Sequence, residues 1–495
     1  MSATTQPSPM NVPAPPKPRR SKRLLRVLWA TLALIVSVSL LWTWSYYSAL
    51  AERDALIAEL HAKGEPVWWD EVVDKLLAEP TENTGADSYL KAVWALGGDY
   101  NRTGPRLPSG SLSMLVNNIG DFQPGNVVPH EPAIVPEVQR QLTLAKPAFD
   151  FLAEAVKRKP GLVTRNIKRS EPNSFLLPHI QDSTALLRMN FWRVYDALAR
   201  RDEATAYYAV WEGFAAAEQL SKEPWVVSQW VRFAMQRQAC RQLVMCLEYA
   251  ATPEESFKKL DALFASLDDS LDLEVCRIGD RAKSLQAWED SETAKVVLQG
   301  WSRHPLAKSV VVKPLEDWWI AALASPLGKP VRLWTQVEEL RLHQRTDPGI
   351  DRPDTDLKAA DVAFQDYHRR SPIHQLASHQ ANRTKDSLGF AATAIAVHRC
   401  LIVHRLALRI RRYYDRHGRF PERLDDLCDA TMPRIRLDWF QGRPLMYTPS
   451  TNGFRVGWRA VPGDDYDADE IVHVELKTLP AIKEALRLGN RPPSP

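Results

Sequence analysis

The sequence is poor in cysteine, with five in 495 residues, and their scattered positions predict no disulfide framework. An odd number leaves at least one cysteine without a partner in the chain. No CxxC motif occurs, and we find no Cys/His pair at metal-ligand spacing. We therefore interpret the cysteines as mostly small buried residues, with a single disulfide as the alternative; they are Cys240, Cys246, Cys276, Cys400 and Cys428.

The short motifs of common enzymes are also missing. There is no GxSxG elbow, P-loop or GxGxxG, and His374 and His379 do not form the HExxH signature of zinc proteases. His404 lies on an apolar helix stripe, six residues after His398 and too far round the helix to share a metal with it. We interpret His404 as a core or surface histidine. Catalytic carboxylates dispersed among sixty acidic residues would leave no motif, so the question of an enzyme stays open.

No acidic residue occurs before Glu52, and this absence predicts the topology. The eighteen residues from Val27 to Trp44 carry no charge, and a helix of about that length crosses a hydrocarbon layer of roughly 30 Å. We predict a transmembrane helix over residues 27–47 that binds the lipid bilayer of the bacterial inner membrane. The positive-inside rule places the N-terminus in the cytoplasm and the C-terminal body in the periplasm. This orientation is assigned from the six cations that precede the apolar segment: Lys17, Arg19, Arg20, Lys22, Arg23 and Arg26.

Aromatic residues at the outer end of this segment support a retained anchor. Trp42, Trp44, Tyr46 and Tyr47 form the belt that amphipathic rings make at the headgroup layer. The alternative is a cleaved signal peptide, because Ala49-Leu50-Ala51 has the small-x-small form of a cleavage site. Both interpretations export the body.

The rest of the chain is not basic. The net charge of +4 includes the six cations of residues 1–26, which leaves 4 − 6 = −2 for the remainder. A balanced body without a Lys/Arg excess argues against nucleic acid as a partner. The proline-rich residues 1–26 predict a disordered basic tail in the cytoplasm.

Helical periodicity dominates the body, which predicts a mainly α fold of stacked antiparallel helices. One expected core stripe contains Val226, Trp230, Phe233, Cys240, Val244 and Leu247. A second contains Phe390, Ala394, Val397, Leu401, His404 and Leu408. A glycine- and proline-rich irregular connection is expected over 98–132. The periodic segments are 133–158, 181–201, 203–222, 224–250, 253–294, 314–345 and 354–417.

The pattern changes near the C-terminus. Gly418 is expected to end a helix in the left-handed conformation, and Pro421 to begin a short second helix. Beyond it, residues 445–447 and 454–458 alternate apolar and other residues on either side of Asn452-Gly453, which predicts a β-hairpin packed on the long helix. The expected module combines a helix and a hairpin in a small α+β unit.

Residues of this module carry a resemblance. In order along the chain they are Tyr414, Gly418, Phe420, Pro421, Leu424, Leu427, Gly442, Arg443, Pro444, Leu445, Tyr447, Gly453 and Phe454. The segment resembles the C-terminal part of uncharacterised single-pass membrane proteins of planctomycete-type bacteria, which is itself similar to the globular domain of type II secretion pseudopilins. Residues 82–89 and 223–233 also resemble those proteins. The anchor lacks the Gly and Glu of a prepilin peptidase site, so the likeness is one of module rather than of assembly.

An acidic run is the metal-site candidate of the sequence. Asp465, Asp467 and Asp469 fit the first three ligand positions of a calcium loop, and the resemblance to pseudopilins also implies calcium in the last loop. Glu470 replaces the required glycine, and Leu476 stands where the bidentate Glu belongs. A solvated acidic loop is the alternative.

These observations predict a membrane-anchored binding or scaffolding protein of the cell envelope, with protein partners there. The alternatives are an envelope hydrolase acting on glycan or peptide and an accessory component of a secretion or pilus-like machine. The expected organisation is a tail (1–26), a transmembrane helix (27–47), a helical extracytoplasmic domain (48–385), a long helix with the pseudopilin-like module (386–480) and a tail (481–495).

Overall fold

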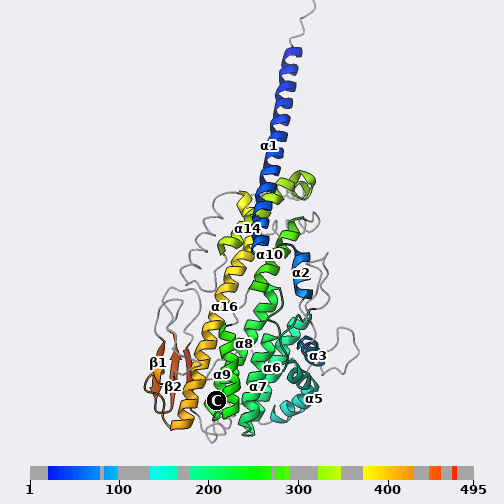
Figure 1. The fold of residues 1–495 in the computed structure, drawn as a ribbon. Coiled ribbons are helices and arrows are strands. Elements are labelled where there is room, and N and C mark those ends of the chain that lie inside the picture. Colours follow the sequence, from blue (N-terminus) through cyan, green and yellow to red (C-terminus); the bar gives the residue numbers. More distant parts are fainter. Residues whose placement is uncertain are drawn as a thin grey trace, which may run out of the picture.

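The fold is mainly α, as predicted, and ends in a small antiparallel sheet (Figure 1). The structure is a computed structural model of the 495-residue chain. It describes residues 20–78, 83–97, 134–164, 178–269, 274–289, 321–346, 372–427, 445–458 and 471–476. The irregular connection expected over 98–132 lies outside these ranges.

Helix α1 (Arg20–Ala62) is the helix in the described part of the chain that is long and apolar enough to cross a membrane. None of its most apolar window is buried against the rest of the protein. The helix ends where Gly64 adopts a positive φ of 76°, a conformation that glycine reaches without steric cost. The anchor and the first helix of the body are therefore one continuous element.

The outer part of α1 packs against α14 (Lys329–Thr346). The Trp334 indole Nε1 donates to Ser45 Oγ at 3.0 Å, and Arg341 forms an ion pair with Glu52. Further along α1, Leu60 is buried with Leu340 and Leu285. Polar contacts near the apolar segment and apolar contacts further along α1 thus join this helix to the body.

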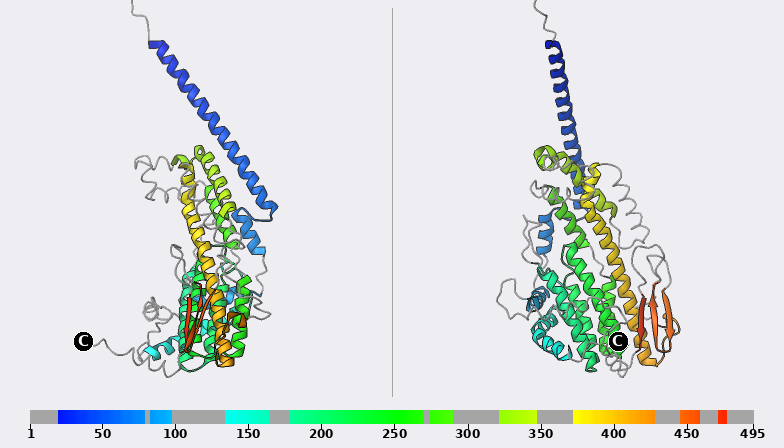
Figure 2. Two further views of the ribbon diagram at one scale, coloured as in Figure 1. Left: turned by 90° about the vertical axis from the view of Figure 1, so that its left-hand side faces the viewer. Right: turned by 180° about the vertical axis from the view of Figure 1, so that it is seen from behind.

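The body is a bundle with one main core (Figures 1 and 2). The segment expected as one helix over 253–294 is two, α9 and α10, and the segment 314–345 contains the short turn η1 (Pro326–Gly328) before α14. Other helices with described bounds are α2 (Trp69–Ala78), α3 (Ala86–Gly97), α5 (Ile134–Ala155), α6 (Pro178–Ala199), α7 (Glu203–Glu218), α8 (Val226–Tyr249), α9 (Glu254–Asp269), α10 (Glu274–Glu289), α16 (Pro372–His417) and η2 (Leu424–Leu427).

Helix α8 lies among α6, α7, α10 and α16. Four members of its expected stripe are buried, but Trp230 is 42% exposed, so its place in the core was wrongly predicted. Because neighbours surround α8 on several sides, polar residues are buried as well. Arg232 is one of them, and its guanidinium binds the Glu218 carboxylate of α7 through Nε at 3.0 Å and Nη2 at 2.8 Å. A single apolar stripe does not describe a helix enclosed in this way.

Helix α16 runs the length of the bundle beside α8 and α9 (Figure 1). The described members of its predicted stripe, from Ala394 to Leu408, are all buried. The helix begins at Pro372, before the domain boundary expected at 385–386, and ends at Gly418, whose φ of 68° matches the predicted left-handed cap.

The predicted hairpin is present as β1 (Met446–Ser450) and β2 (Gly453–Gly457). A third strand, β3 (Ile471–Glu475), pairs antiparallel with β2 and was not predicted. In this sheet, ordered β1-β2-β3, Phe454, Val456 and Val474 face inward and are buried in the main core. β3 contacts both α8 and α16, so the sheet is part of the body and not a separate unit.

A buried ionic group joins α9 to α16. Asp261 Oδ1 accepts from Arg405 Nε at 2.9 Å, and its Oδ2 accepts from Arg409 Nη2 at 2.6 Å. Burial by itself raises the pKa of Asp261, but the two guanidiniums outweigh burial and hold this pKa below its ordinary value. Arg409 also donates to the Leu427 carbonyl at 3.2 Å, which ties η2 to the same point.

We expect Asp261→Asn to lower the free energy of unfolding by about 3–5 kcal/mol, because two buried guanidiniums lose their counter-charge. The matched control is Glu422→Gln, whose pair with Arg419 is exposed and should change stability by less than about 1 kcal/mol. Denaturant unfolding of the full chain in detergent, followed by tryptophan fluorescence, gives both values. Equal midpoints for the two variants would contradict the role of the buried group.

Candidate functional site

The acidic loop expected to bind calcium lies outside the described residues. Asp465, Asp467 and Asp469 fall between β2 and β3, in a stretch for which the structure gives no geometry. Calcium binding there stays a prediction. The described part of the chain offers a different group of ligating side chains, in the core.

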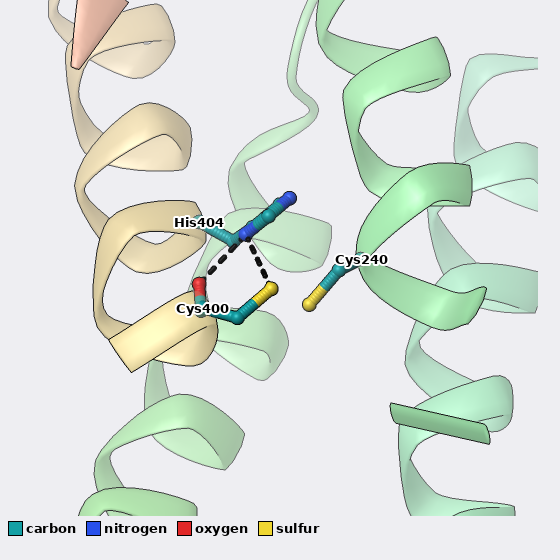
Figure 3. A group of neighbouring side chains, drawn as sticks. All are labelled: Cys240, Cys400 and His404. Atoms are coloured by element: carbon teal, nitrogen blue, oxygen red, sulfur yellow. Dashed lines mark hydrogen bonds between the residues drawn. The ribbon is translucent and has the colours of Figure 1, made fainter. Parts of the chain in front are cut away.

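Three such side chains meet where α8 and α16 lie side by side: Cys240, Cys400 and His404, here called the cysteine–histidine cluster (Figure 3). Cys400 and His404 are four residues apart on α16, so both project from one face of that helix. Cys240 faces them from α8. Cys240 and His404 are buried, at 2% and 7% exposure, while Cys400 is only partly buried.

Two sulfur atoms and a ring nitrogen of this cluster lie within 4.8 Å of one another. His404 Nδ1 is 2.7 Å from the backbone oxygen of Cys400 and 3.4 Å from its Sγ. A carbonyl oxygen accepts hydrogen bonds and never donates them, so Nδ1 carries the proton in this arrangement. Figure 3 shows Nδ1 turned toward the sulfur atoms and Nε2 turned away. The Cys400 sulfur is therefore placed as an acceptor, which suits a thiolate.

The electrostatics of the pair agree with this geometry. A hydrogen bond from the Cys240 thiol, together with the neighbouring His404, holds the pKa of Cys400 well below its ordinary value despite burial. Burial alone lowers the pKa of His404, but the Cys400 sulfur outweighs it and leaves this pKa raised. By contrast, burial raises the pKa of Cys246, which lies further along α8, well above the ordinary thiol value. Cys400 and His404 thus favour a thiolate–imidazolium pair.

The expectation that no Cys/His pair has metal-ligand spacing was wrong. Cys400 and His404 have the i,i+4 spacing that places two ligands on one helix face. The sequence interpretation paired His404 only with His398 and so did not include Cys400. Cys240 is far away in the chain and reaches the site through tertiary packing alone. Burial is confirmed for Cys240, Cys246 and Cys276, which form no disulfide, and His404 faces the core. Cys428 lies outside the described residues.

A second buried polar group surrounds Glu223, at the turn between α7 and α8. Its Oε1 accepts from the backbone N–H groups of Val163 and Thr164 at 2.9 and 2.8 Å, and its Oε2 accepts from Thr164 Oγ1 at 2.9 Å. His179 Nε2 lies 3.8 Å from Oε2. Nearby, the Tyr89 hydroxyl donates to Ser183 at 2.8 Å.

Burial decides the charge of these residues. It raises the pKa of Glu223 to about 7, against the opposing hydrogen bonds, and lowers the pKa of His179 to about 4. His179 is therefore neutral at neutral pH. Glu223 has no exposed surface, and its contacts hold Val163 and Thr164 against the α7–α8 turn. We interpret this group as part of the framework of the fold.

Packing accounts for individual residues of the segments 83–89 and 223–233. A Cβ on Gly85 would lie 2.4 Å from the Ala155 carbonyl oxygen, so only glycine fits there. Tyr89 is fully buried, and Trp225 packs its ring 6.1 Å from that of Trp69. Tyr89 lies in the main core and Trp225 in a second, smaller apolar cluster, so packing explains these two residues.

No known family model, curated protein or solved structure matches this chain.

The raised pKa of Glu223 has a consequence for stability. The folded protein binds this proton more tightly than the unfolded chain, whose carboxyl has the ordinary value of 4.5, so the contribution of Glu223 to the free energy of unfolding falls as the pH rises from about 4.5 to about 7. His179 contributes the opposite trend between about 4 and 6.5, because its folded pKa is lowered.

Glutamine resembles the protonated acid. In Glu223→Gln we therefore expect the contribution of this residue to the free energy of unfolding not to change with pH. The stability of the wild type minus that of the variant should decrease by on the order of 3 kcal/mol at most between pH 4.5 and 7, at 1.36 kcal/mol per unit of pKa. Denaturant unfolding at a series of pH values measures it. In a His179→Asn background the decrease should persist, whereas a pH-independent difference would show that Glu223 is not a titrating buried acid.

Proposed function

We propose that this protein is a single-pass, membrane-anchored scaffolding or binding protein of the bacterial cell envelope, with its helical body outside the cytoplasmic membrane. The proposal rests on the continuity of α1. This helix continues without a break from its apolar segment into the part that packs against α14. A body joined in this way keeps a defined orientation relative to the bilayer.

The contacts beside the apolar segment support this orientation. The Trp42 indole N–H donates to the Leu327 carbonyl at 2.9 Å, and the Leu327 side chain is 75% exposed. The Lys329 ammonium lies 5.6 Å from the centre of the Tyr46 ring. Tryptophan, lysine and an exposed leucine together suit the headgroup layer, which supports a position of the η1 turn near the outer surface of the membrane.

The structure also bears on cleavage of the anchor. A cut at Ala49-Leu50-Ala51 would fall inside α1, at a point where Ala49 is fully buried. Residues on the C-terminal side, such as Glu52, still contact α14. A helix held on both sides of the site supports a retained anchor over a cleaved signal peptide.

Scaffolding is favoured by the shape of the body. α16 has 46 residues, which corresponds to roughly 70 Å, and it extends from the region of α1 and α14 to the sheet (Figures 1 and 2). The sheet therefore lies far from the end of the body that meets the membrane. Its outer face carries Thr448, Arg455 and His473 side by side in register, all exposed.

The resemblance to planctomycete-type membrane proteins with a pseudopilin-like module fits this proposal. A long helix packed on an antiparallel sheet is consistent with such a module, and the likeness keeps an accessory role in a secretion or pilus-like machine as the second candidate. A hydrolase is less well supported, because the carboxylates of Glu223 and Asp261 are held in buried hydrogen bonds.

Topology can be tested with fusions at both ends. Alkaline phosphatase, which is active only outside the cytoplasm, should be active after Pro495 and inactive before Met1, because the cations precede the apolar segment. Replacing the six cations of residues 1–26 by glutamine is the control and should randomise the orientation. An inactive C-terminal fusion, or purified protein lacking residues 1–51 by mass, would contradict a retained anchor with an external body.

The binding surface can be tested in cells with a photo-crosslinking amino acid at Thr448, on the edge strand β1. We expect discrete crosslinked partners, because an exposed edge strand offers backbone groups for pairing. The matched control is the same amino acid at Lys258 on α9, which is also exposed. Identical adducts at both positions, or none at Thr448, would count against the sheet as the binding surface.

A further inference from the structure

We propose that Cys240, Cys400 and His404 bind one zinc ion, which joins α8 to α16 inside the body. The three side chains come from two helices that form the centre of the fold, and their ligand atoms already face one another (Figure 3). This site is independent of where the protein binds its partners.

The distances fit zinc. Zinc binds thiolate sulfur at about 2.3 Å and imidazole nitrogen at about 2.0–2.1 Å in tetrahedral geometry, which separates two sulfurs by roughly 3.8 Å and a sulfur from a nitrogen by roughly 3.5 Å. Cys400 Sγ and His404 Nδ1 are 3.4 Å apart. All three ligand atoms lie within 4.8 Å of one another, so movements of about 1 Å bring them to coordination geometry.

The total charge of the three ligands favours a divalent ion such as zinc. Two thiolates and a neutral imidazole carry −2, which Zn²⁺ neutralises, and a neutral complex is the one that a buried site accepts at low cost. Calcium and magnesium prefer oxygen ligands, and copper(I) with the same ligands would leave an uncompensated negative charge. Cys240 and His404 are almost completely buried, which makes neutrality decisive here.

The protons balance. In the metal-free protein the Cys240 thiol holds one proton, and a second proton is held between Cys400 Sγ and His404 Nδ1, which are 3.4 Å apart. Zinc binding releases both, so Nδ1 donates its lone pair to the metal instead of donating a hydrogen bond to the Cys400 carbonyl. Three protein ligands leave a fourth position for water, on the side of the partly exposed Cys400. Affinity should therefore increase with pH.

The direct test uses the full-length protein in detergent, reduced with a phosphine and freed of metal. Cobalt(II) serves as the optical probe, because it gives a thiolate charge-transfer band. We expect one cobalt ion per chain, displaced by one equivalent of zinc. Cys240→Ala, Cys400→Ser and His404→Gln should each weaken binding on the order of a hundredfold.

The matched control is Cys246→Ala, which removes a buried thiol from the same helix but outside the site, and it should bind cobalt like the wild type. A second measurement needs no variant: zinc should protect Cys400 of the wild-type protein from alkylation, read out by peptide mass. The proposal is overturned if the reduced protein binds no cobalt, if binding survives Cys400→Ser, or if it is lost in Cys246→Ala. It is also overturned if zinc leaves the alkylation of Cys400 in the reduced protein unchanged. Formation of a disulfide between Cys240 and Cys400 on oxidation would not alter that conclusion.

Discussion

The contact of α16 with α8 and α9 is the interaction on which the rest of the body depends. Apolar side chains of α16 are buried along it, and the same contact contains the Asp261 ion group and the cysteine–histidine cluster. The sheet is packed on these helices through β3 and β2. Because interiors are close-packed, a shift of α16 would disturb all of these features together.

Burial explains why the ionisable groups differ in charge. Asp261 keeps its charge since two guanidiniums bind it, whereas Glu223, which meets only neutral donors and a neutral histidine, has a raised pKa. Cys400 is a third case, because a thiol donor and a histidine favour its thiolate. Burial decides the charge of Glu223, whereas charged or hydrogen-bonding partners outweigh burial at Asp261 and Cys400.

The anchor imposes the second constraint. Since α1 continues into the body and packs on α14, its apolar segment and the bundle share one continuous helix. Exposed apolar surface on α1 has no partner within the described protein, which is the expected state of a lipid-facing helix. The proposed anchor at one end of the body and the sheet at the other are the basis on which we propose a scaffolding role.

Local patterns in the sequence determined much of this architecture: the apolar segment of α1, the helical class of the body, the glycine cap at Gly418 and the hairpin of β1 and β2. These features depend on neighbours within a few residues, which a single sequence contains. For the cysteine–histidine cluster, the sequence contained only the i,i+4 spacing of Cys400 and His404. Cys240, the strand β3 and the exposure of Trp230 were decided by the tertiary structure, because each depends on which helices and strands pack together across long separations in the chain.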